Sequence, residues 1–123
     1  MKTLAQIRAD NALKAAKKPG MGLGKEGGDA LSGFPMLIKM DGLLAALAFA
    51  IERKSENSRK HPGAFLIANA IAEHLSNKKI GIASSTNADD LVKELANDPD
   101  DSKLRRATAE TLAYINYLKR FVV

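Results

Sequence analysis

Residues that could act in catalysis or hold a metal ion are few in this sequence, and they lie far apart. The chain has no cysteine, which excludes disulfides, thiolate nucleophiles and cysteine-ligated zinc. Its two histidines, His61 and His74, have no further histidine at metal-ligand spacing, and Glu73 would point about 100° away from His74 on a helix. We therefore expect no catalytic residue, no metal site and no cofactor, and we interpret His74 as a surface or half-buried helix residue.

A glycine-rich stretch, "KKPGMGLGKEGG", is the one motif that suggests nucleotide chemistry. Gly22, Gly24 and Gly27 satisfy G-x-G-x-x-G, but that motif requires a strand before it, and here a helical pattern comes first. Glu26 also stands where a phosphate-binding loop would place the Ser or Thr that holds magnesium. We interpret residues 19–30 as a mobile loop without a nucleotide.

The stretch with recognisable binding chemistry is "RRATAETLAYINYLKRFV", near the end of the chain. At 100° per residue, one face is the expected core face and holds Leu104, Ala107, Thr108, Thr111, Leu112, Ile115, Leu118 and Val122. The opposite face holds Arg105, Arg106, Ala113, Asn116, Tyr117 and Arg120. Arginine makes planar, bidentate contacts to phosphate, and a tyrosine between arginines can stack on a base or sugar. This combination favours contact with an RNA backbone.

An ordinary solvated face accounts for part of the same pattern. Arg106 and Glu110 have the i,i+4 spacing of a helix ion pair, and Lys119 with Arg120 favour a helix C-terminus through the dipole. The residues alone therefore leave two functions open. One is nucleic-acid binding, and the other is a helical protein-interaction module whose basic faces contact acidic partner surfaces.

The periodicity around these residues is helical almost throughout. A chain of 123 residues fits one compact domain, and we expect an all-α, single-domain bundle of about five to six helices over residues 1–123. Helices are expected over residues 2–18, 31–40, 42–54, 64–75 and 86–96, and from about residue 99 to the C-terminal end. Segment 42–54 is so uniformly apolar that we place it at the centre of the core.

Helix starts are predicted from their capping residues. Thr86 and Asp89 have capping-box spacing for the short acidic helix. Asp98 is the expected N-cap of the last helix, followed by Pro99 at its first position. The N-terminal segment has neither a signal-peptide pattern nor a membrane span, so we expect a cytoplasmic protein without membrane contact.

Charge is distributed unevenly around a net charge of +5. Residues 1–18 and 102–123 each carry five basic residues against one acidic residue, a local +4, whereas residues 86–101 carry six acidic residues against one lysine, a local −5. Such a field can steer a polyanion to one side of the molecule. It also lets neighbouring copies meet acid to base, through the predicted subunit contacts Asp89, Asp90, Asp98, Asp100 and Asp101.

Two motifs give the chain a family resemblance. "FPMLIKMDGLLAALAF" and "LRRATAETLAYINYLKRFV" together resemble the small-subunit family of the Cmr complex, the type III-B CRISPR effector that destroys RNA. The matching positions are Pro35, Ile38, Gly42, Leu43, Leu47, Ala48 and Phe49, and then Arg106, Ala107, Thr108, Glu110, Tyr117, Leu118, Lys119, Arg120 and Phe121. There are two departures. Tyr117 stands where the family often has tryptophan, which keeps an aromatic platform, and Asp41 stands where an amide is common, which places negative charge at that turn.

The resemblance implies a non-catalytic helical subunit. Members of that family stack with copies of themselves beside larger backbone subunits, and they line the path of guide RNA paired with target RNA. It makes the basic first helix a companion of the last one in contacting RNA. The predicted RNA-binding residues are then Arg8, Lys14, Lys17, Lys18, Arg105, Arg106, Tyr117, Lys119 and Arg120.

Overall fold

The computed structural model describes residues 1–21 and 24–122, and the side chains of these residues apart from 24–29. The described chain forms six helices and one two-stranded antiparallel hairpin. These elements are α1 (Leu4–Ala16), α2 (Gly24–Asp41), α3 (Leu43–Ala50), β1 (Arg53–Ser55), β2 (Ser58–Arg59), α4 (Pro62–Ser76), α5 (Ala88–Asn97) and α6 (Ser102–Phe121). The predicted all-α, single-domain class with five to six helices is confirmed.

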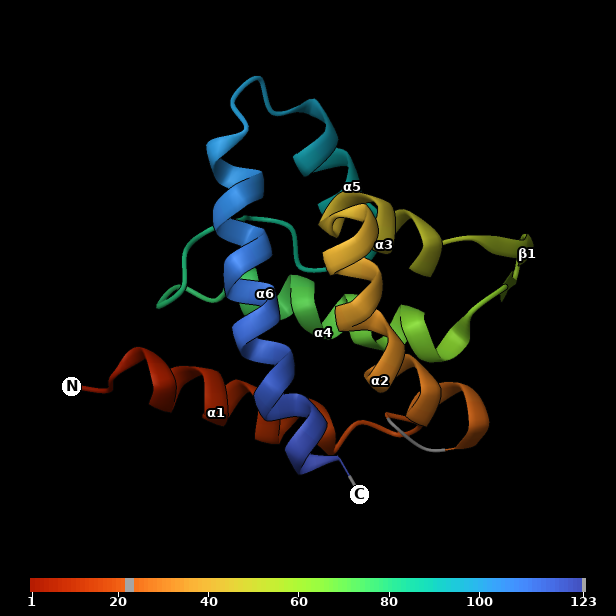
Figure 1. The fold of residues 1–123 in the computed structure, drawn as a ribbon, viewed down its shortest axis with the longest axis horizontal. Helices are drawn as coiled ribbons and strands as arrows, with labels where there is room; N and C mark the ends of the chain where they lie inside the picture. The colour runs from red at the N-terminus through yellow and green to blue at the C-terminus, as the bar shows by residue number, and fades with distance from the viewer. Residues whose placement is uncertain (22–23, 123) are drawn as a thin grey trace.

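The helices pack around α4, which lies behind α6 in Figure 1. Nine of its fifteen residues are buried, and five of these nine are Gly or Ala, so neighbouring helices can approach its backbone closely. The long last helix, α6, contacts α1, α2, α3 and α4, while α5 contacts α3 and α4. The centre of the core is therefore α4, and our placement of segment 42–54 there is wrong.

Helix α3 lies at the surface although its sequence is wholly apolar. Leu43, Ala46, Leu47 and Ala50 are buried, whereas Ala45, Ala48 and Phe49 are exposed. The helix is separated from α2 by Gly42, whose φ of +92° is a conformation that a side chain would strain. It ends at Ala50 rather than at residue 54, because the chain then turns into the β1–β2 hairpin, where Arg53 pairs with Arg59.

Two helix starts differ from the predicted ones. Asn87, not Thr86, is the N-cap of α5, and its side-chain oxygen accepts a hydrogen bond from the amide of Asp90. Helix α6 begins at Ser102 rather than at Pro99. Asp98 is not its N-cap, because its carboxylate accepts a hydrogen bond from the amide of Asp100 within the connecting turn.

The glycine-rich connection is shorter than the predicted loop over residues 19–30. Helix α2 begins at Gly24, and residues 22–23 lie outside the described residues. Glycine costs about 1 kcal/mol in a helix interior, a weak preference that tertiary packing can override, and α2 packs on α3, α4 and α6. Among the described residues, no helix is both long and apolar enough to cross a membrane.

Candidate nucleic-acid interface

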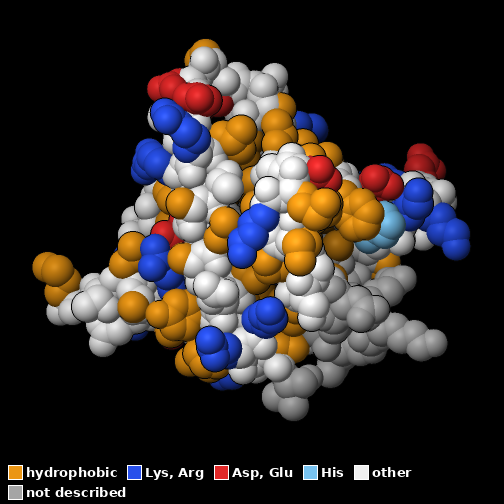
Figure 2. Space-filling view, in the orientation of Figure 1, with side chains coloured by type: hydrophobic (Ala, Val, Ile, Leu, Met, Phe, Trp, Pro, Cys, Tyr) orange, Lys and Arg blue, Asp and Glu red, His pale blue; other side chains and the backbone are white. Residues whose placement is uncertain are grey.

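The outer face of α6 carries exposed cations at both of its ends. Arg105 and Arg106 lie near the N-terminal end, and Lys119 and Arg120 lie near the C-terminal end, about 20 Å away along the helix axis. In Figure 2, Lys and Arg side chains lie over α6 from its upper end to its lower end. The one carboxylate within α6, Glu110, is buried on the other side. We define Arg105, Arg106, Lys119 and Arg120 as the basic face of α6.

Most of these cations are free of internal ion pairs. Arg105 lies 3.4 Å from Asp101, but both side chains are about three-quarters exposed, at 74% and 76%, so this ion pair contributes little. Arg106, Lys119 and Arg120 make no ion pair with any residue that the structure describes. The predicted exposure of Arg105, Arg106 and Arg120 is confirmed, and Lys119, which was not assigned to this face, is exposed as well.

Tyr117 lies at the edge of this face rather than on it. The side chain is half-buried, and its ring centroid is 6.3 Å from that of Phe121. The buried face of α6 is rotated by roughly 50° from the predicted core face, at 100° per residue. It consists of Ala107, Glu110, Thr111, Tyr114, Ile115 and Leu118. Tyr117 therefore offers only part of its ring for stacking.

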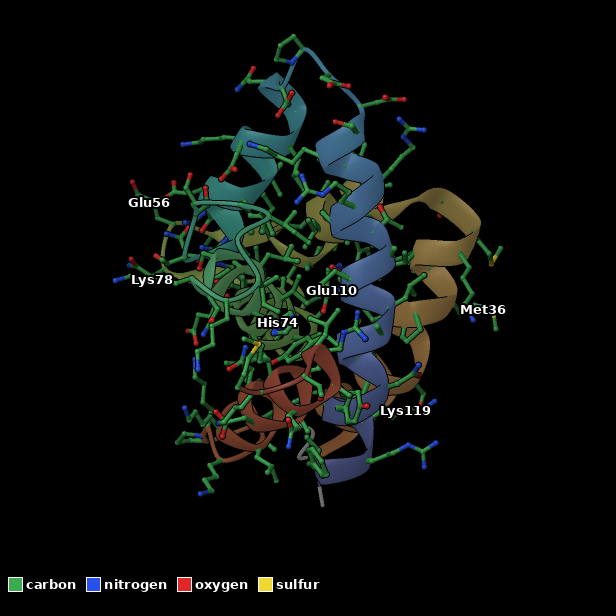
Figure 3. All side chains as sticks on the ribbon, turned by 90° about the vertical axis from the view of Figure 1, so that its left-hand side faces the viewer. Met36, Glu56, His74, Lys78, Glu110 and Lys119 are labelled. Atoms are coloured by element: carbon green, nitrogen blue, oxygen red, sulfur yellow. The ribbon has the colours of Figure 1, made fainter. Side chains whose placement is uncertain are left out.

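The rotation is explained by a buried polar cluster that joins α1, α4 and α6. Arg8 donates two hydrogen bonds to the carboxylate of Glu110, from Nε at 2.7 Å and from Nη2 at 2.8 Å. His74 Nε2 lies 2.9 Å from Glu110 Oε2, and the Asn11 amide lies 2.9 Å from His74 Nδ1. Figure 3 shows His74 and Glu110 beside each other between α4 and α6. We refer to Arg8, Asn11, His74 and Glu110 as the polar cluster.

The hydrogen bonds of the polar cluster assign its protonation. Because the Asn11 amide nitrogen can only donate, Nδ1 of His74 is the acceptor and Nε2 carries the proton that bonds Glu110. Burial lowers the pKa of His74, against the opposing effect of Glu110. Burial alone would raise the pKa of Glu110, but the hydrogen bonds from Arg8 and His74 outweigh it and lower that pKa. A neutral His74 beside an ionised Glu110 is therefore the state at neutral pH.

The polar cluster corrects three of our predictions. His74 is buried and stacks on Tyr114, with ring centroids 4.1 Å apart, so it is not a surface residue. Glu110 pairs with Arg8 rather than with Arg106. Arg8 itself is held inside the fold by this pair, so its guanidinium is not free for RNA.

Two of the three lysines in the last turn of α1 and just after it are also engaged within the molecule. Lys14 lies 3.1 Å from Asp10, and Lys18 pairs with Glu73 of α4. Lys17 is exposed and makes no ion pair with a described residue. The first helix thus presents less free positive charge than its sequence suggests, and the basic face of α6 is the stronger candidate for RNA contact.

The predicted acidic contacts divide into internal and exposed ones. Asp89 accepts two hydrogen bonds from Arg59, at 3.1 and 2.7 Å, and these lower its pKa. Asp98 lies 3.4 Å from Lys103, and the Asp100 carboxylate accepts bonds from the amide and hydroxyl of Ser102. Asp90, Asp100 and Asp101 are exposed and remain largely free for a neighbouring molecule, with local bonds to Asn87, Ser102 and Arg105.

In the described part of the chain, no three His, Cys, Asp or Glu side chains gather closely enough to hold a metal ion. The fold and the basic face define a small, single-domain helical protein with an exposed basic surface on its last helix.

Comparison with known proteins identifies the family. The family described as "CRISPR-associated protein (Cas_Cmr5)" matches residues 4–123, so the chain belongs to the Cmr5 family of CRISPR-associated proteins. It is also similar to the X-ray crystal structure of a CRISPR-associated Cmr5 family protein from Thermus thermophilus. That match has 26% sequence identity and a TM-score of 0.66, and it covers 99% of this chain and 96% of that chain. No curated protein gives a significant match. The resemblance seen in the sequence is confirmed.

Proposed function

We propose that this protein is a non-catalytic structural subunit of the Cmr complex, the CRISPR effector that targets RNA, and that it works in the cytoplasm. In this role it lines the path of guide RNA paired with target RNA, assembles with larger backbone subunits and stacks with further copies of itself. The observation that carries the proposal is the basic face of α6, where Arg106, Lys119 and Arg120 have no ion-pair partner among the described residues. Membership of the Cmr5 family supports the same role.

The chemistry of this face suits a phosphate backbone. Three unpaired cations and Arg105 project from one helix, and the exposed positions between them are occupied by Ala109 and Asn116. These small and neutral side chains let a strand approach the helix without like-charge repulsion. Contacts of this kind are made to phosphates and carry no base code, which fits a subunit that must accept any guide sequence.

The other predicted RNA contacts have smaller roles in this proposal. Lys17, directly after α1, adds one cation without an ion pair among the described residues, and Tyr117 contributes stacking only through the exposed part of its ring. Lys14 and Lys18 would first have to leave Asp10 and Glu73. We leave Arg8 out of this proposal, because moving it away from Glu110 would leave a buried carboxylate unpaired.

The salt dependence of RNA binding by the assembled complex tests the proposal. Each phosphate contact that is lost should flatten the slope of log affinity against log salt concentration by roughly 0.7 to 0.9. We expect Arg106→Glu with Arg120→Glu to flatten that slope and to weaken binding of every target sequence. Lys54→Glu with Lys78→Glu is the charge-matched control, because both lysines are exposed and lie outside α6.

The alternative function, a protein-interaction module, predicts a different result. If the basic face contacts an acidic protein, the double arginine variant should fail to join the complex. Complexes that do contain the variant would then bind RNA with the affinity and salt slope of the parent. Quantifying subunit stoichiometry beside RNA affinity separates the two functions.

A further inference from the structure

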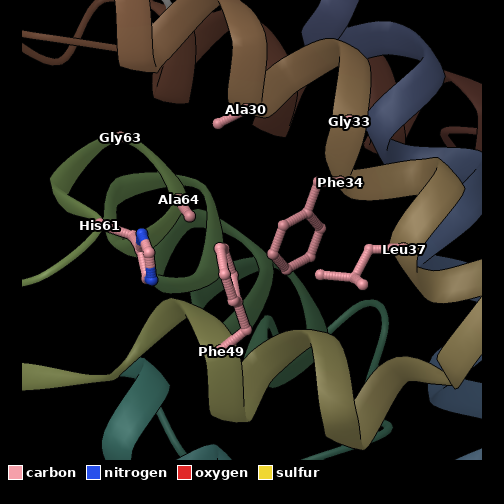
Figure 4. Close-up of a pocket in the computed structure, with 8 residues that line it drawn as sticks. All are labelled: Ala30, Gly33, Phe34, Leu37, Phe49, His61, Gly63 and Ala64. Atoms are coloured by element: carbon pink, nitrogen blue, oxygen red, sulfur yellow. The ribbon is translucent and has the colours of Figure 1, made fainter.

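We propose that a pocket between α2, α3 and α4 is an anchor site for a tyrosine or tryptophan side chain of a different protein. The pocket has a volume of about 410 Å³ and lies away from the basic face, with none of its described lining residues on α6. Its lining residues are Ala30, Gly33, Phe34, Leu37, Phe49, His61, Gly63 and Ala64 (Figure 4). The proposal does not depend on RNA binding.

Aromatic rings form the walls of this pocket. The Phe49 ring stacks on His61, with centroids 3.8 Å apart and an interplanar angle of 17°. Figure 4 shows Phe49 between His61 and Phe34, so the ring face that His61 leaves open is turned toward the pocket. Phe34 is only 3% exposed and gives a fixed opposite wall, whereas Phe49 is 38% exposed. A planar aromatic group entering here can stack on Phe49 or meet a ring edge.

The surface around the pocket is apolar as well. Met40 is 74% exposed and lies one helical turn from Leu37, which lines the pocket. Ala45 and Ala48 extend the apolar surface along α3, and Figure 3 shows Met36 projecting outward from α2. A helix that is apolar on all sides is normally buried on all sides, so the exposed half of α3 is a surface that a protein partner would cover.

The charges beside the pocket favour a protein side chain over a nucleobase. None of the described lining residues is a lysine or arginine that could hold the phosphate attached to a base. The Glu52 carboxylate lies 3.6 Å from His61 Nε2 and also 3.6 Å from Lys60 Nζ, so it balances the charge of the lysine next to His61 at this edge of the pocket. The same carboxylate can accept a hydrogen bond from a phenol hydroxyl or an indole N–H. Tyrosine and tryptophan combine an apolar ring with such a polar tip, and they are enriched among anchors of interfaces.

A second copy of this chain is a poor source for the anchor. The sequence has no tryptophan, and of its tyrosines Tyr114 is buried and Tyr117 is half-buried. Among the described large hydrophobic side chains that are exposed, Phe49 of the pocket itself is the only aromatic one. The anchor must therefore come from another protein.

Side-chain analogues test the site on the full chain. We would titrate isotope-labelled protein with p-cresol and 3-methylindole, and in parallel with uridine and adenosine 5′-monophosphates, following the amides of Phe49, Gly33 and Gly63 by NMR. Fragments of this size bind in a single site with dissociation constants on the order of millimolar. We expect saturable shifts at these amides with p-cresol and 3-methylindole, and at least tenfold weaker effects with the nucleotides.

A variant that fills the pocket with a larger side chain tests whether the analogues bind there. Gly33→Leu should remove the saturable shifts, or weaken binding at least tenfold. A Cβ at Gly33 meets no atom within 4 Å, so the fold should tolerate the new side chain. Ser32→Leu adds the same group at an exposed position of α2 outside the pocket and is the matched control, with thermal unfolding reported for both. The proposal is overturned if the analogues shift other regions instead, if Gly33→Leu binds them as the parent does, or if the nucleotides bind the pocket as tightly.

Discussion

Arg8, in the first helix, and Glu110, in the last, are joined by two parallel hydrogen bonds of 2.7 and 2.8 Å although 102 residues separate them. The pair is largely removed from solvent, since the side chains retain only 22% and 8% of their exposure. Helix α1 packs along α6, and its buried side chains are two alanines, Ala12 and Ala15. The position of α1 on the bundle therefore depends strongly on this pair.

Removing Arg8 from its ion pair with Glu110 should destabilise the fold. Arg8→Ala leaves the buried carboxylate of Glu110 without its cation, and we expect a loss of about 3 kcal/mol in the free energy of unfolding, measured by urea denaturation. Arg105→Ala is the control, because it removes an exposed ion pair with Asp101 and should cost no more than about 0.5 kcal/mol.

The combined variant Arg8→Met with Glu110→Gln should recover most of that loss. No buried charge remains in it, and the glutamine oxygen can still accept the hydrogen bond from His74. A double variant that is less stable than Arg8→Ala would contradict the assignment of the cost to an unpaired carboxylate.

His74 should make stability sensitive to mild acid. Its folded-state pKa is lowered by burial, so as the pH falls below its unfolded value, near 6.5, the unfolded state takes up a proton that the folded state does not. This contribution to stability is fully present above that pH and is lost on acidification toward the folded pKa. We expect a loss of about 1 kcal/mol between pH 7.5 and pH 5.5.

The variant His74→Gln isolates this effect. Glutamine can accept a hydrogen bond from Asn11 and donate one to Glu110, but it does not titrate. Urea denaturation across the same pH range should therefore show a flatter dependence in the variant, whatever its stability at neutral pH. An equal dependence in the two proteins would mean that other groups cause it.

The exposed carboxylates Asp90 and Asp101 should affect assembly rather than folding. If copies meet acid to base, Asp90→Lys and Asp101→Lys should each lower the number of copies in the purified complex, measured by native mass spectrometry. Glu56→Lys, on the exposed hairpin, makes the same change of charge and should leave the stoichiometry unaltered. An equal loss in the control would show a general effect of net charge.

Much of the fold and of the basic face follows from local pattern. Helical spacing placed Arg105, Arg106 and Arg120 on the outer face, where all three are exposed, because side-chain direction on a helix depends only on position along it. It did not place Lys119 there, since 100° per residue puts Lys119 between Thr108 and Leu112 of the predicted core face, yet Lys119 is exposed. The same spacing predicted burial of Ala107, Thr111, Ile115 and Leu118, which is confirmed.

The polar cluster could not be predicted in this way, because its partners come from three helices far apart in the sequence. Helical spacing predicted Arg106 as the partner of Glu110. The structure shows that Arg8, from another helix, is the partner instead. One signal of the rotated buried face was present in the sequence of α6. Glu110 and Tyr114 are four residues apart, so they lie on one side of the helix, next to the buried Ala107 and Leu118. The prediction that α3 is the centre of the core failed for a related reason. An apolar composition predicts burial, but it does not say whether the helix is buried by this chain or by a partner protein.

The central claim is that the outer face of α6 lies against RNA in the assembled complex, and site-specific photo-crosslinking tests it most directly. We would place p-benzoylphenylalanine at Asn116, which is exposed on this face one turn before Arg120, and at Glu56 as a control. After irradiation, crosslinks from position 116 to guide or target RNA are expected, with none from position 56. Crosslinks from position 116 to protein alone, in complexes that contain both RNAs, would contradict the claim and identify the basic face as a protein interface.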